Sequence, residues 1–213
     1  MAFLTIERDG GILTATMNQP ETRNALTGNT AVQEFVQLCE DVRKDASVKV
    51  LIITAAGPIF SSGGNVKDMK RFFDDALTPD LIREEYRQGI QQIPNALVQL
   101  DVPVICAING PAIGAGLDLT CMCDIRIASE TATFAESFVR VGIVPGDGGA
   151  WLLPRAVGMA KASEMAFTGE PISAQEALAC GLVSRVVAAD QLLPTARALA
   201  AKIAANPGAV MRM

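Results

Sequence analysis

Two apolar stretches, at residues 48–54 and 102–108, constrain the fold of this chain more than any other feature. Both are rich in β-branched residues and show almost no alternation of polar and apolar side chains. Such stretches are typical of strands buried on both faces of a parallel sheet. Between residues 29 and 43, apolar side chains recur at helical spacing. Strands that alternate with helices predict an α/β fold with a layered, largely parallel sheet.

The composition fits one folded domain, because 50% of the 213 residues are hydrophobic and 19% are charged. We expect a core over residues 1–190 and the start of a C-terminal helical region over residues 191–213. Asp190 is expected to cap the first helix of that region.

Turn and cap signals place several further elements. Apolar runs on both sides of Asp9-Gly10-Gly11 predict a hairpin. Thr78 followed by Pro79 predicts a helix start, and apolar spacing continues that helix to Leu100 with a bend at Pro94. A capping box at Ser173 and Glu176 predicts another helix.

The absence of histidine excludes many mechanisms. No Ser-His-Asp triad, no Cys-His dyad and no imidazole base can form, so proton transfer falls to carboxyl, amine, phenol or thiol groups or to water. The formal net charge of −5 argues against a nucleic-acid partner, since such affinity depends on clustered Lys and Arg.

Cysteine usage and the N-terminus bear on location. The five cysteines are odd in number and scattered, and the chain starts without a basic segment or a long apolar run. This favours free thiols in a reducing, cytoplasmic setting. Cys121 and Cys123 lack a second pair, so we expect no metal site. No run of about 18 apolar residues is present, so we expect no membrane span.

Three segments share one form, in which a strand ends in a glycine-rich corner that opens into a helix. They are residues 53–65, 108–119 and 143–150. The first N–H groups of a helix have no partners within it, so such corners can bind a developing oxyanion. On spacing alone, the simpler interpretation is that the glycines permit tight turns.

Carboxylates are the candidates for proton chemistry. Asp118 lies in an apolar run, where burial would raise its pKa. Asp147 lies between two glycines at the third corner, and a turn-forming role is the alternative. Glu136 is equally well explained as a solvated loop residue. For Asp124, pairing with Arg126 or another structural role is favoured over chemistry.

The corners and their order resemble the crotonase superfamily, the enoyl-CoA hydratase/isomerase proteins. The resemblance spans most of the chain. It is carried by Asn-Gln-Pro-Glu-Thr-Arg-Asn-Ala-Leu at 18–26, by residues 60–69, 107–116 and 123–128, and by the Pro-Gly-x-Gly-Gly corner at 145–149.

The resemblance implies a fold of repeated ββα units in two roughly perpendicular sheets, flanked by helices and assembled as a trimer or a dimer of trimers. It implies an acyl-CoA thioester substrate, as in fatty acid metabolism, with coenzyme A as part of the substrate and no other cofactor. The thioester oxygen would accept hydrogen bonds from the backbone N–H groups of Ser62 and Ala115. The positions matched to substrate and CoA contact are Arg23, Ala25, Ser62, Gly63, Gly64, Asn65, Gly114 and Phe138.

This chain departs from the family pattern in two ways. Hydratases of the family place two glutamates on the substrate; Asp118 matches the first, but Phe138 stands at the second. We expect Asp147 to supply the missing function. Family members also continue through further C-terminal helices, so we expect a shortened C-terminal helical region here. Either the remaining helices are missing from this chain or the site is more open.

These observations predict an enoyl-CoA hydratase or isomerase that works through a thioester enolate, with Asp118 and Asp147 as catalytic residues. One alternative is other chemistry of the superfamily, either carbon–carbon hydrolysis of a diketone or double-bond isomerisation with a single Asp base. Another is an acyl-CoA binder without catalysis.

Overall fold

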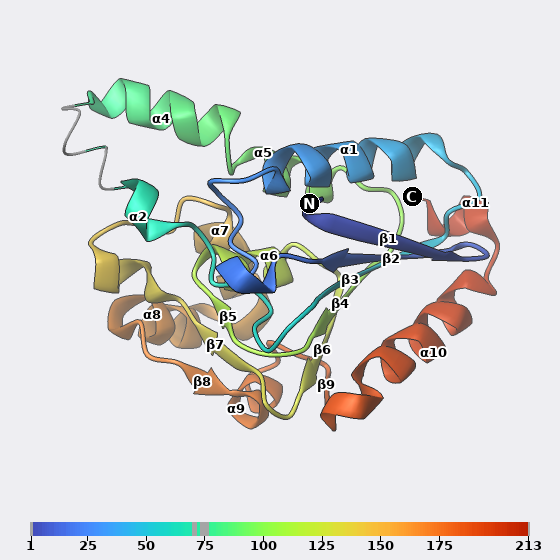
Figure 1. Ribbon diagram of the computed structural model, residues 1–213. Helices are drawn as coiled ribbons and strands as arrows, with labels where there is room; N and C mark the ends of the chain where they lie inside the picture. The colour runs from blue at the N-terminus through green and yellow to red at the C-terminus, as the bar shows by residue number, and fades with distance from the viewer. Residues whose placement is uncertain (1, 70–71, 73–76, 213) are drawn as a thin grey trace.

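The computed structural model describes residues 2–69, 72 and 77–212, and it contains a six-stranded sheet in the order β1-β2-β3-β4-β6-β9 (Figure 1). β1 and β2 form the predicted antiparallel hairpin, and the other neighbours pair in parallel. The α/β class with a largely parallel sheet is therefore confirmed. The strands are β1 (Leu4–Asp9), β2 (Ile12–Met17), β3 (Val50–Ala55), β4 (Val104–Ile108), β6 (Ile125–Ser129) and β9 (Arg185–Val187).

A second, three-stranded sheet has the order β5-β7-β8. Its strands are β5 (Ala112–Ile113), β7 (Thr133–Ala135) and β8 (Ile172–Ser173). Elements of two or three residues carry no periodic signal, so the sequence did not predict them. This sheet includes part of the second corner, in β5, and the residues that directly precede Glu136, in β7.

Helices cover both faces of the main sheet. The α-helices are α1 (Ala31–Lys44), α2 (Val66–Met69), α4 (Pro79–Gln88), α5 (Gln92–Val98), α6 (Ala115–Cys121), α7 (Gly149–Val157), α8 (Met159–Thr168), α9 (Ala174–Ala179), α10 (Leu192–Ala204) and α11 (Gly208–Met211). Short 3₁₀ helices lie at Pro20–Thr22, Ser137–Val141 and Ala189–Gln191. In the parts of the chain that the structure describes, no helix has the length and apolar character needed to cross a bilayer.

The buried strands divide their side chains between two cores. Val50 and Ile52 face α10, where Leu192, Ala196 and Ala200 pack. The alternate residues of β3 join the larger core with α1 and α5. Figure 1 accordingly shows α1 and α10 on opposite sides of the sheet. α10 is thus packed on the core, while the division at residue 190 stays a prediction.

Three predicted features differ in detail. The long helix breaks into α4 and α5 at Gly89 (φ −103°, ψ −121°), not at Pro94. Pro94 lies in the first turn of α5, where a missing N–H leaves no helical bond unmade. Asp190 lies in a 3₁₀ turn, and α10 begins after Gln191 without a side-chain cap. The third corner follows a 3₁₀ helix rather than a strand. Gly142 (φ 73°) ends that helix.

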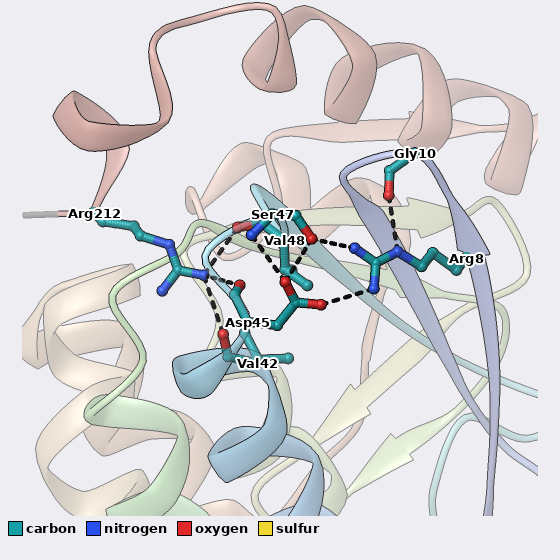
Figure 2. Close-up of polar contacts among 7 residues, drawn as sticks. All are labelled: Arg8, Gly10, Val42, Asp45, Ser47, Val48 and Arg212. Atoms are coloured by element: carbon teal, nitrogen blue, oxygen red, sulfur yellow. Dashed lines mark hydrogen bonds and ion pairs between the residues drawn. The ribbon is translucent and has the colours of Figure 1, made fainter.

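Arg212 fastens the C-terminal turn to the connection between α1 and β3 (Figure 2). Its guanidinium donates to the carbonyl oxygens of Val42, Asp45 and Val48. It also pairs with Asp101 at 2.8 Å. Arg8 binds the side chain of Asp45 from the hairpin, so the same connection is held from two sides.

Candidate active site

The first two glycine-rich corners lie side by side. The Ser61 N–H donates to the Pro111 carbonyl at 3.2 Å, and the Ile113 N–H donates to the Ser61 carbonyl at 3.0 Å. A Cβ at Gly116 would lie 2.5 Å from the Ser61 oxygen. Glycine is needed there because any side chain would push the two corners apart.

One backbone N–H group in each of these two corners has no hydrogen-bond acceptor among the described residues. Neither the Gly64 N–H nor the Ala115 N–H donates to any acceptor among the described residues. The Ser62 N–H, in contrast, already donates to the Arg23 carbonyl at 3.0 Å. The structure therefore does not support the sequence-based choice of Ser62, and Gly64, two residues later, has the available amide.

Asn24 holds the first corner in place through hydrogen bonds. Asn24 is fully buried in the left-handed region (φ 50°), and its amide donates to the carbonyls of Ala56 and Ile59 at 3.0 and 2.9 Å. The Ser61 hydroxyl donates to the Asn24 carbonyl at 2.8 Å. Arg23 is exposed and Ala25 is buried, so only the Arg23 side chain of this pair is open to a ligand.

Three carboxyl groups are buried together. Asp118 is 0% exposed, Glu136 1% and Asp147 3%. They come from α6, from the end of β7 and from the third corner. The expected burial of Asp118 is confirmed. The interpretation of Glu136 as a solvated loop residue is wrong, because the small sheet carries it inward.

Contacts among these carboxyls are unusual. The Gly149 N–H, at the start of α7, donates to Asp118 Oδ2 at 3.1 Å. The side chains of Asp118 and Glu136 are close enough to share a hydrogen bond once one of them is protonated. Asp118 Oδ1, Glu136 Oε2 and Asp147 Oδ1 receive no N–H or hydroxyl donor from the described residues. Within the same residues, no Lys or Arg forms an ion pair with any of the three.

Burial shifts all three pKa values upward. It raises the pKa of Asp118 well above its usual range, and the charges of Glu136 and Asp147 raise it further. The pKa of Glu136 rises to about 7, mainly through burial. Burial also raises the pKa of Asp147 to about 6. The cluster can therefore hold both a proton donor and a proton acceptor near neutral pH.

A cavity of about 430 Å³ opens beside this cluster. Asp147 is the one carboxyl of the three that lines it. Of the positions matched to substrate contact, Gly64, Asn65 and Phe138 also line it. Gly114 lies beside it, since a Cβ there would be 3.7 Å from the Phe138 ring.

Tyr86 is a cavity residue that the sequence did not single out for function. It lies on α4, and a Cβ at Gly146 would be 3.4 Å from its ring. Burial and then the charge of Asp147 raise the pKa of its phenol. Its only sequence signal was its place in the apolar stripe of a helix.

Asp124 and Arg126 have structural roles, but not as a pair. Asp124 accepts from the Val104 N–H at 2.8 Å. Arg126 donates to the carbonyls of Leu182, Thr120 and Cys123. Among the described residues, no cluster of Cys, Asp and Glu is arranged to hold a metal ion.

Comparison with known proteins decides the family. A family model described as enoyl-CoA hydratase/isomerase matches residues 7–213. The chain belongs to the enoyl-CoA hydratase/isomerase family. It is an enzyme of that type, which confirms the resemblance seen in the sequence.

Relatives within the enoyl-CoA hydratase/isomerase family carry different activities. A probable enoyl-CoA hydratase of Mycobacterium bovis is 36% identical, over 99% of this chain and 78% of its own. A 1,2-epoxyphenylacetyl-CoA isomerase of Escherichia coli is 34% identical, over 97% of this chain and 78% of its own. An enoyl-CoA hydratase structure from Bacillus anthracis has a TM-score of 0.90 at 32% identity, covering 99% of this chain and 80% of that one.

Proposed function

We propose that this member of the family moves a double bond along the acyl chain of an enoyl-CoA thioester. Ionised Asp147 removes a proton from the substrate carbon that faces it. The resulting enolate places negative charge on the thioester oxygen, where the Gly64 and Ala115 N–H groups stabilise it. Protonated Asp118 supplies a proton to the far carbon of the original double bond, so that the double bond moves one position toward the thioester. One C–H bond breaks and another forms, and no water is consumed.

One observation carries this choice. Asp147 lines the cavity together with the buried Phe138. Phe138 is the residue that stands where hydratases of the family have their second glutamate. Addition of water needs two polar groups that hold and activate the water molecule. A phenyl ring offers neither a donor nor an acceptor at that position, whereas proton removal from carbon needs only one base.

A turnover experiment tests the proposal. A 3-enoyl-CoA incubated with the protein in deuterated water should become the 2-enoyl-CoA, and no 3-hydroxyacyl-CoA should accumulate. Asp147→Asn should lower kcat by about 10²–10⁴. Full activity in that variant would remove Asp147 from the mechanism.

Water addition is the second candidate, and the names of several relatives favour it. In this case crotonyl-CoA in oxygen-labelled water should give a product labelled at the β-carbon. A β-diketone substrate and a panel of other acyl-CoAs, followed for turnover and for binding, test carbon–carbon hydrolysis and binding without catalysis in the same assay. No cofactor beyond the CoA of the substrate is part of the proposal.

We also propose that the protein assembles as a homotrimer or a dimer of trimers in the cytoplasm. Large apolar side chains stand exposed around α7 and α8, among them Trp151 (65%), Met159 (70%) and Phe167 (79%). Such a surface is typical of an interface. Five unpaired thiols support a reducing compartment. Light scattering measures the mass, and a monomer would contradict the assembly.

A further inference from the structure

We propose that Glu136 is a positioning residue that shares a single proton with Asp118 and so keeps Asp118 in its acid form. The proposal rests on the proposed function for the role of Asp118. Glu136 itself does not line the cavity and acts on the substrate only through Asp118. Its position is not one of those that the family resemblance matched to a catalytic role.

Burial without a cation favours one proton shared between the two groups. Both side chains are at least 99% buried, no described Lys or Arg forms an ion pair with either, and they are close enough to share a hydrogen bond once one of them is protonated. Two carboxylates have only acceptors, so a hydrogen bond between them exists only when one carries a proton. The unpartnered oxygens Asp118 Oδ1 and Glu136 Oε2 have no other described donor.

The surroundings offer no competing source of charge balance. Asp147 faces the pair from the third corner and adds a like charge. Cys121 lies near Asp118 on α6. Burial raises the pKa of the Cys121 thiol to about 12, so the thiol stays neutral. Tyr86 faces Asp147 from α4 and also stays protonated. The Gly149 N–H is the one described donor to the pair, and it occupies Asp118 Oδ2.

Proton sharing has a direct consequence for catalysis. The hydrogen bond that protonated Asp118 donates to Glu136, together with the charges of both neighbouring carboxylates, favours the protonated form of Asp118. If Glu136 becomes neutral and cannot ionise, Asp118 loses one like-charge neighbour and becomes a stronger acid. Asp118 would then be ionised over more of the pH range and unable to donate a proton.

The test is a carboxyl titration of the free enzyme by NMR, with ¹³C-labelled Asp and Glu. In the wild type, the Asp118 and Glu136 signals should respond together near pH 7, where the pair goes from two protons to the one that it shares, and Asp118 should lose that proton only at higher pH. In Glu136→Gln, the Asp118 titration should move down by at least about one pH unit. The alkaline limb of kcat should move down with it, while KM changes little.

Glu130→Gln is the matched control, since Glu130 is an exposed carboxylate between β6 and β7. It should titrate and turn over as the wild type does. An unchanged Asp118 titration in Glu136→Gln would overturn the proposal. The proposal would also be overturned if Glu136 of the wild type ionised at the ordinary pKa of a glutamate. This second measurement does not depend on the folding of a variant. The titration uses no substrate. If Asp118 and Glu136 titrate together but the protein shows no isomerase turnover, only the proposed function is contradicted.

Discussion

Gly149 donates its N–H to Asp118 Oδ2 at 3.1 Å, and a Cβ at this position would lie 2.0 Å from Asp118 Oδ1. The start of α7 therefore rests directly on the buried carboxyl of α6. The N–H and the helix dipole stabilise negative charge on Asp118, while its other neighbours oppose that charge. Glycine is the only residue that allows this approach.

Gly149→Ala should displace Asp118 and lower both stability and activity. Forcing a methyl group against a buried carboxyl costs about 1–3 kcal/mol of unfolding free energy. Denaturant unfolding and kcat measure the two effects. Gly208→Ala is the matched control, because Gly208 also begins a helix and a Cβ there meets Lys49 at an ordinary 3.8 Å. Equal stability of the two variants would contradict the close contact.

The rate of isomerisation should depend on pH as a bell. Asp147 must be ionised, so activity falls as the pH drops through about 6. Asp118 must keep its proton, and its pKa lies well above its usual range, so activity should fall again only at more alkaline pH. Because these groups are coupled, the pKa values taken from the pH profile of kcat/KM are apparent values. A profile with no acid limb near pH 6 would contradict the assignment of Asp147 as the base.

Asp147→Asn should make the protein more stable at alkaline pH while it removes activity. Burial raises the pKa of Asp147 from 3.8 to about 6, so ionisation costs stability above the unfolded pKa and the cost is complete above the folded one. At about pH 8 the variant should gain roughly 1–3 kcal/mol, and at about pH 4 almost nothing. Thermal unfolding at both pH values checks this. The exposed Asp190→Asn is the control, and a matching gain there would contradict the explanation.

Ala115→Pro should remove one oxyanion donor and little else. Ala115 is the first residue of α6, a position where proline is well tolerated. Loss of the N–H should lower kcat by about 10²–10³. Ala115→Gly keeps the N–H and should retain most activity. Thermal unfolding of both variants shows whether the proline has disturbed the fold, and a fully active, folded Ala115→Pro would remove this amide from the mechanism.

The sequence predicted those features that depend on neighbours along the chain. The apolar run around Asp118 indicated its burial, and the two long apolar stretches indicated the parallel sheet. Features that depend on distant contacts were missed or left open. The Ser62 amide is occupied by the carbonyl of Arg23, so the free amide is that of Gly64, and no local pattern shows this. Glu136 stayed ambiguous because strands of two and three residues carry it inward.

Phe138→Glu should convert part of the activity to water addition. Phe138 lines the cavity together with Asp147, so a carboxyl at this position faces the same space and can hold a water molecule. A further buried carboxyl should lower stability by roughly 1–3 kcal/mol. Crotonyl-CoA in oxygen-labelled water should then give a β-labelled product that the wild type does not form. Phe138→Leu is the control, because it opens space without adding a polar group. If the folded Phe138→Glu variant adds no water, or if Phe138→Leu adds as much, the aromatic ring is not what separates isomerisation from hydration in this cavity.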